Sequence, residues 1–144
     1  MSTNSQFAIA VHTMALLARS GDDPAKSDCI ARSVNTNPVI IRRTICALAD
    51  AGLVTSQSGP TGGSRLAKPT ESINLLDIYH ALEQRPIFGL HCRTPDPDCP
   101  VGKNIELVLC NIQHQVEFAM NKELAGITLG QVVQQLEPEL VNCG

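Results

Sequence analysis

Residues 37–67 read NPVIIRRTICALADAGLVTSQSGPTGGSRLA, a helix signal followed at once by a hairpin signal. Asn37 is a favourable N-cap and Pro38 suits the first helical position. Gly52 suits the position just past the end of a helix. Strand-like residues 53–57 and 64–67 then flank a turn at 59–63 that is rich in glycine. The stretch predicts a helix over 38–51 and a two-stranded β-hairpin behind it.

The predicted helix has an apolar face and a polar face. One apolar stripe is formed by Ile41, Ile45 and Leu48. The residues expected to point away from it are Val39, Arg42, Arg43, Cys46 and Asp50. The apolar stripe predicts packing on a core, and the other face is free to meet a partner.

Helical patterns surround this stretch on both sides. Two helices precede it, one over 5–19 and a short one from about residue 27. Asn74 with Asp77 resembles a capping box that opens a fourth helix, and Thr128 with Gln131 does the same for a last helix. Three helices followed by a hairpin are typical of a winged helix-turn-helix domain. The predicted fold is therefore mainly α with a small β-hairpin.

The longest predicted helix begins at Pro100 and runs to about residue 124. At 1.5 Å per residue it would be about 36 Å long. Its apolar residues recur at spacings of three and four: Val101, Ile105, Val108, Ile112, Val116 and Ala119. Such a seam favours pairing with a second copy in a homodimer. The alternative is a core helix within a single bundle.

Composition narrows the function classes. With 3% aromatic residues and no Trp, the chain lacks the stacking faces typical of single-strand binders. Residues 1–70 carry seven Lys or Arg and four Asp or Glu, whereas residues 71–144 carry four and ten. A basic first half suits a nucleic-acid module. The sequence contains no recognised catalytic motif, secretory signal or membrane-spanning run, so we expect a cytoplasmic protein that is not an enzyme and does not bind membranes.

Double-stranded DNA is the partner that the charged helix face and the glycine-rich turn predict. An arginine fork can pair with guanine or with phosphate, and glycines let a backbone approach closely. The expected contact residues are Asn37, Val39, Arg42, Arg43, Ser58, Gly59, Thr61, Gly62, Gly63, Ser64 and Arg65. Solvated surface charge is the alternative reading of the arginines, and a winged helix that binds only proteins is the alternative of another class.

Four stretches of the chain resemble, in the same order, the Rrf2 family of bacterial regulators. They are NPVIIRR at 37–43, AGLV at 51–54, GPTGGSRLA at 59–67 and LLDIY at 75–79. The resemblance covers nearly the whole chain. It implies a winged helix, a long dimerisation helix and promoter binding, with Arg42 and Arg43 on the reading helix and Ser58 to Arg65 in the wing. Among its members are regulators that carry an iron–sulfur cluster on three closely spaced cysteines.

Cysteines in the loop before the long helix are the candidate sensors. Cys99 precedes Pro100, and a thiol at a helix N-cap has a lowered pKa, so we expect Cys99 to be reactive with Cys92 as its resolving partner. Both could instead be structural. The family's three-cysteine pattern is broken, because Cys110 would lie about 16 Å along the helix from Cys99. We therefore expect no cofactor; an iron–sulfur cluster on Cys92 and Cys99, with Cys110, His91 or His12 as further ligands, is the lesser alternative.

Two other cysteines, Cys29 and Cys46, are expected to be small packing residues in short helices. The predicted organisation is a DNA-binding domain over 1–84, an effector loop over 85–100, a dimerisation helix over 101–126, and a C-terminal helix and tail over 127–144. We expect a homodimeric transcription regulator, a repressor, that binds a pseudo-palindromic operator. Its signal would be redox, thiol-reactive or a small-molecule effector; a cluster-binding sensor of the same fold is the alternative.

Overall fold

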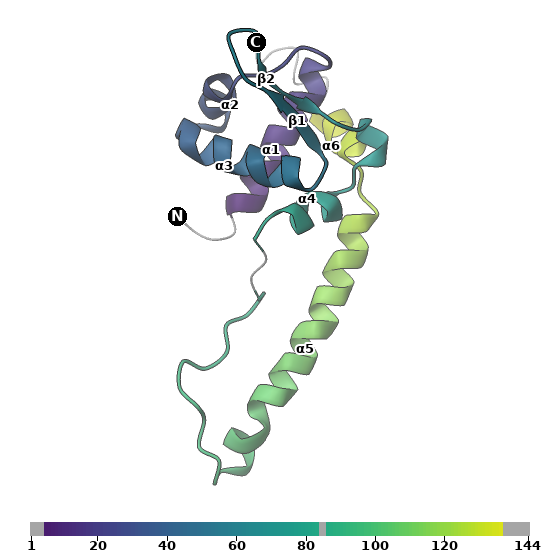
Figure 1. Ribbon diagram of the computed structural model, residues 1–144. Helices are drawn as coiled ribbons and strands as arrows, with labels where there is room; N and C mark the ends of the chain where they lie inside the picture. Colours follow the sequence, from purple (N-terminus) through teal and green to yellow (C-terminus); the bar gives the residue numbers. More distant parts are fainter. Residues whose placement is uncertain (1–4, 84–85, 137–144) are drawn as a thin grey trace. The chain divides into compact units, whose positions relative to one another are not determined.

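The computed structural model describes residues 5–83 and 86–136. Its elements in chain order are α1 (Ser5–Ser20), α2 (Ser27–Val34), α3 (Pro38–Asp50), β1 (Val54–Gln57), β2 (Gly63–Leu66), the 3₁₀-helix η1 (Thr70–Ser72), α4 (Leu75–Ala81), α5 (Pro100–Ala125) and α6 (Leu129–Leu136) (Figure 1). The chain divides into two compact units, one made of residues 1–83 with 124–144 and the other of residues 84–123. The mainly helical fold with one small hairpin is confirmed.

Helices α1, α2 and α3 surround the core of the first unit. Every residue of the predicted α3 stripe is buried there: Ile41, Ile45 and Leu48. Met14 and Leu17 of α1 and Ile30 of α2 belong to the same core cluster, and each of these side chains is at most 1% exposed. Burial of such side chains stabilises the fold by about 1.5–3 kcal/mol each. The core therefore fixes which face of α3 is left outside.

Both ends of α3 are closed as the sequence predicts. The Asn37 side chain accepts a hydrogen bond from the Val39 N–H at 2.7 Å, and Pro38 begins the helix. At the other end Gly52 has φ +79°, and the Leu53 N–H donates to the Leu48 carbonyl at 3.0 Å. This is a Schellman motif, which needs a left-handed residue at that position. It turns the chain directly into β1.

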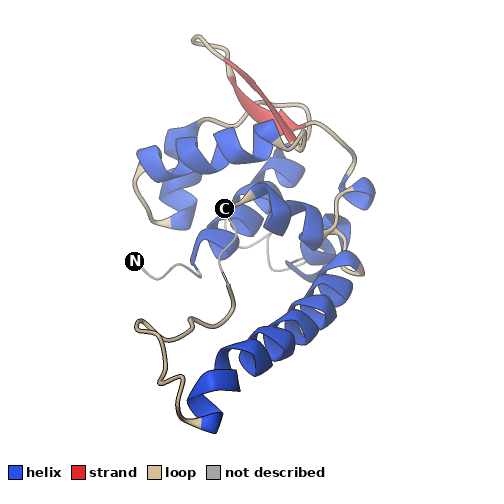
Figure 2. Ribbon diagram, turned by 60° about the horizontal axis from the view of Figure 1, so that its bottom comes forward, coloured by secondary structure: helices blue, strands red, loops and turns tan. Residues whose placement is uncertain are grey.

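The hairpin pairs β1 and β2 antiparallel, with Thr55 opposite Arg65 and Ser56 opposite Ser64. Figure 2 shows the two strands as a ribbon that extends beyond the helices around it. A third segment joins it, because Ala25 and Ser64 exchange two backbone hydrogen bonds of 2.9 Å. The link between α1 and α2 thus anchors the hairpin, a contact that local sequence patterns do not reveal.

Helix α6 belongs to the first unit and packs against α1 and η1. The capping boxes at Asn74 and at Thr128 both form, with side-chain to backbone distances of 2.8–3.1 Å. The segments before α4 and α6 pair with each other, since the Leu129 N–H donates to the Ile73 carbonyl at 2.8 Å. Leu129 is fully buried, so α6 completes the core around Ile73.

The second unit consists of an extended segment and most of α5. Helix α5 is 26 residues long and none of its residues is buried. The predicted apolar row is exposed at Val101 (68%), Val108 (48%) and Ile112 (44%), and Leu107 (67%) and Phe118 (74%) add a second exposed stripe. None of the helices in the described part of the chain combines the length and apolar character required to cross a bilayer.

Candidate nucleic-acid interface

The outward face of α3 carries the residues that the sequence places there. The exposed side chains are Val39, Arg42, Arg43, Cys46 and Asp50. Arg42 is 59% exposed and its Nη2 lies 3.8 Å from Oδ1 of Asp28 in α2, itself 78% exposed. A pair so open to solvent contributes little and breaks readily. Arg42 is therefore held loosely and can exchange this carboxylate for a phosphate or a base edge.

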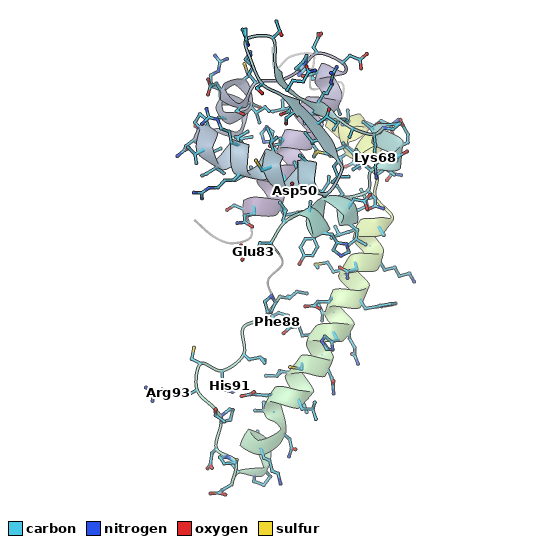
Figure 3. The ribbon with its side chains drawn as sticks, viewed as in Figure 1. Asp50, Lys68, Glu83, Phe88, His91 and Arg93 are labelled. Carbon is cyan, nitrogen blue, oxygen red and sulfur yellow. The ribbon has the colours of Figure 1, made fainter. Side chains whose placement is uncertain are left out.

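Arg43 is exposed on the neighbouring flank of α3. One residue along a helix is a turn of about 100°, so Arg42 and Arg43 diverge and do not form a single fork. Asp50, near the C-terminal end of α3 (labelled in Figure 3), is also exposed. A carboxylate there disfavours phosphate, so the cationic part of the face is confined to the first two turns of α3.

Lys26, at the start of α2, is hydrogen-bonded to the hairpin turn. Its Nζ donates to the carbonyl of Pro60 at 3.0 Å and to that of Gly62 at 3.1 Å. Gly62 packs so closely that an added Cβ would lie 2.2 Å from the Gln57 carbonyl oxygen. Lys26 adds a cation to the base of the turn and joins it to the start of α2. The sequence analysis missed this lysine because its partners lie more than thirty residues away.

The expected hairpin contacts divide into exposed and supporting residues. Ser58, Gly59 and Thr61 are exposed at the tip of the turn, and Gly59 has φ +98°. Gly62 and Ser64 are buried, which changes their expected role from contact to support. The Ser64 hydroxyl pairs with that of Ser56 at 3.0 Å, across the two strands.

Two further members of the expected set are partly covered. Gly63 has φ +152°, and a Cβ there would meet the Ala25 carbonyl at 2.8 Å. Arg65 is half-buried and its Nη1 donates to the Asp22 carbonyl at 3.5 Å. Asn37 is exposed, but its side-chain oxygen is used in the cap of α3. The outer surface of the site thus consists of Val39, Arg42 and Arg43 on α3, the tip of the hairpin and Lys26.

Cys99 lies at the N-cap of α5, as the sequence predicts. The Lys103 N–H donates to the Cys99 carbonyl at 2.8 Å, which opens the helix. Backbone N–H groups of Gly102, and then of Val101, lower the pKa of the exposed Cys99 thiol. The turn is tight, since a Cβ on Gly102 would lie 2.5 Å from the Asp96 carbonyl oxygen. This geometry favours the thiolate, the reactive form of the group.

The other proposed sensor and ligand residues belong to three different segments of the chain. Cys92 and His91 are exposed on the segment before α5 (Figure 3 labels His91), and Cys110 is half-buried on the helix. His12 of α1 is exposed and its Nε2 pairs with the Ser33 hydroxyl at 2.9 Å. Within residues 5–83 and 86–136, no three His, Cys, Asp or Glu side chains gather into a metal-ligand set. Cys92, Cys99, Cys110 and His91, which belong to one unit, therefore do not form a ligand set by themselves.

Cys29 and Cys46 differ from expectation, because both are exposed rather than packed. Cys29 accepts a hydrogen bond from Nη2 of Arg32, one turn further along α2. Cys46 belongs to the outward face of α3, which the helix period indicated. Their apolar sequence neighbours belong to the opposite side of each helix.

Comparison with known proteins places this geometry in context. Residues 3–135 match the family model Rrf2, described as an iron-dependent transcriptional regulator. A Bacillus subtilis protein, YwnA, named as an HTH-type transcriptional regulator, is 42% identical over 134 residues, 92% of this chain and 98% of its own. The IscR regulator of Cereibacter sphaeroides is 31% identical over 85 residues, 58% of this chain and 55% of its own. The expectation of a regulator rather than an enzyme is confirmed.

Solved structures agree on the fold. One described as a DNA-binding protein is 37% identical and superposes with a TM-score of 0.72 over 88% of this chain and 97% of its own. The global cysteine regulator CymR of B. subtilis, 24% identical, gives 0.64 over 94% of this chain and 96% of its own. A regulator from Lactobacillus plantarum is 24% identical and superposes with a TM-score of 0.80 over 92% of this chain and 90% of its own.

Proposed function

Because the chain belongs to the Rrf2 family of transcriptional regulators, we propose that it is a homodimeric repressor that reads a pseudo-palindromic operator. The observation that carries this proposal is the outward face of α3, which exposes two arginines, together with an exposed hairpin tip that Lys26 anchors. In winged-helix proteins the second helix of the motif enters the major groove. Here α3 would read bases with Arg42 and Arg43, while the tip contacts the adjacent backbone. Such a function belongs to the cytoplasm.

The unpartnered apolar faces of α5 support the homodimer. A 26-residue helix without a buried residue leaves its apolar rows in water unless another surface covers them. A second copy of the same helix would bury Val101, Val108 and Ile112 of each chain. Two DNA-binding units held in this way match half-sites about 10–10.5 base pairs apart, or a multiple of that spacing.

Sedimentation of two variants tests the dimer. Ile112→Asp places a carboxylate in the apolar row and is expected to yield monomers that bind operator DNA at least tenfold more weakly. Lys103→Glu adds a carboxylate on the opposite side of α5 and is expected to remain dimeric. A wild-type protein that sediments as a monomer at micromolar concentration would disprove this part of the proposal.

The proposed signal is chemical modification of Cys99 with Cys92 as partner. Its support is the lowered pKa of an exposed thiol at the start of the helix that would hold the dimer together. Oxidation there alters the first turn of α5. Mild peroxide followed by mass spectrometry tests the idea: Cys99 should react before Cys29 and Cys46, and equal reactivity of all three would exclude it.

An iron–sulfur sensor of the same fold is the second candidate, favoured by the iron dependence in the family description. The donors available would be Cys92, Cys99 and Cys110, with His91 or His12. They do not form a ligand set within one chain, so we derive no step through a cluster. The absorption spectrum and iron content of anaerobically purified protein separate the two candidates, since a cluster gives a brown protein and a thiol sensor a colourless one.

A further inference from the structure

A cavity of about 430 Å³ lies on the flank of α3 within the first unit. Its walls come from α1, from α3 and from the residues that follow α4, where Figure 3 labels Glu83. The apolar part of its lining is formed by Ile9, Ile40, Ala47 and Leu82. The volume is at the small end of the range of about 300–1,000 Å³ for pockets that hold organic ligands.

Two opposite charges line the same cavity, Arg43 and Glu83. Among the residues that the structure describes, neither Arg43 nor Glu83 takes part in an ion pair. A guanidinium and a carboxylate that line one partly apolar cavity are complementary to a small molecule that carries both charges. A simple hydrocarbon or a simple acid would leave one or both of them without a partner.

We propose that this cavity binds a zwitterionic α-amino acid with an apolar side chain. Its carboxylate would pair with Arg43, its ammonium group with Glu83, and its side chain would cover Ile9, Ile40 and Leu82. The assignment deepens the proposed function and rests on it, because it supplies the class of small-molecule effector for a DNA-binding regulator.

Arg43 couples the cavity to the DNA-binding face. It lies at the border between the outward face of α3 and the cavity, so one guanidinium serves both. An amino acid that pairs with Arg43 neutralises a cation that DNA would otherwise use. Ligand and operator therefore compete, and each lowers the affinity of the other by the same factor, about tenfold for one charged contact.

Calorimetry on the full-length protein without DNA tests the binding step. The probes are L-leucine, its relative without the amino group (4-methylpentanoate) and its relative without the carboxylate (3-methylbutylamine), with L-valine, L-isoleucine, L-methionine and L-phenylalanine to vary the side chain. We expect at least one apolar amino acid to bind at or below millimolar concentration. The two truncated relatives should bind at least tenfold more weakly than leucine, or not at all.

Glu83→Gln is the matched variant, and Glu71→Gln, an exposed acid in η1, is its control. Glu83→Gln should weaken amino-acid binding about tenfold without weakening operator binding in the absence of ligand, whereas Glu71→Gln should alter neither. The proposal is overturned if no apolar amino acid binds, if 4-methylpentanoate binds as tightly as leucine, or if Glu83→Gln binds like the wild type. Operator binding without ligand is measured in the same series, so failure of the DNA-binding function would be seen separately.

Discussion

Nη2 of Arg42 in α3 lies 3.8 Å from Oδ1 of Asp28 in α2, so a carboxylate is paired with one of the cations expected to contact DNA. Both side chains are well exposed, at 59% and 78%, and the pair must separate before Arg42 can reach a duplex. In the free protein Asp28 is a competitor for Arg42, and a negative charge beside the reading helix also repels phosphate.

Replacing this competitor should tighten DNA binding. Asp28→Asn removes the charge with little change in shape, and we expect operator affinity to rise about two- to fivefold, as for the loss of a weak exposed pair. The free energy of unfolding should change by less than about 0.5 kcal/mol. Fluorescence anisotropy with a labelled duplex and urea denaturation measure the two quantities. Weaker operator binding in Asp28→Asn would instead mean that Asp28 orients Arg42 for its target.

Lys26 should act on DNA through the hairpin that it holds. Lys26→Met removes both hydrogen bonds to the turn at Pro60 and Gly62. We expect operator affinity to fall about tenfold, because the tip loses its support and the site loses a cation. Lys68→Met removes an equal charge from an exposed lysine outside the turn and should lower operator affinity by less than threefold. Equal losses of operator affinity in the two variants would show that only the charge of Lys26 matters and that its hydrogen bonds to the hairpin turn do not.

Cys99 should stay reactive to lower pH in the folded protein than in the unfolded chain. Its thiol pKa is lowered by the Gly102 and Val101 N–H groups, so the thiolate persists to lower pH and is lost only as pH falls through the lowered value. Alkylation by iodoacetamide, followed by mass spectrometry from pH 5 to 10, should therefore show a lower midpoint for Cys99 in the folded protein than in the urea-unfolded chain.

A variant of the capping turn provides the control for that experiment. Gly102→Ala would place a methyl group 2.5 Å from the Asp96 carbonyl oxygen and displace the turn. The alkylation midpoint of Cys99 should then move up toward its value in the urea-unfolded chain. If Cys99 has the same midpoint in the folded and the unfolded protein, the N-cap geometry has no chemical consequence.

Local signals carried most of the fold. The α3 boundaries were predictable because Asn37, Pro38 and Gly52 each satisfy a specific requirement of a helix end. The outward residues of α3 followed from helical periodicity alone. Contacts between distant segments were not predictable in this way: the Ala25–Ser64 pairing, the Lys26 clamp and the return of α6 onto α1 depend on tertiary packing.

The candidate site was only partly predictable, for a related reason. Sequence reasoning treated the hairpin turn as uniformly exposed, but Ser64 and Gly62 face Ser56 and Gln57 across the ribbon and are buried. In the same way, apolar neighbours in the sequence suggested packing for Cys29 and Cys46, although the helices turn both cysteines outward. Burial is set by what lies opposite in space, which neighbours along the chain do not report.

The central claim is that the outward face of α3 binds duplex DNA through Arg42 and Arg43. The most direct measurement is operator affinity by anisotropy, at several salt concentrations, for the wild type and the double variant Arg42→Ala with Arg43→Ala. We expect the double variant to lose roughly 2–5 kcal/mol of binding free energy while keeping its helical content, and the dependence of log K on log salt to become less steep because two cations are removed. A folded double variant that binds the operator as tightly as the wild type, with the same salt dependence, would contradict the account.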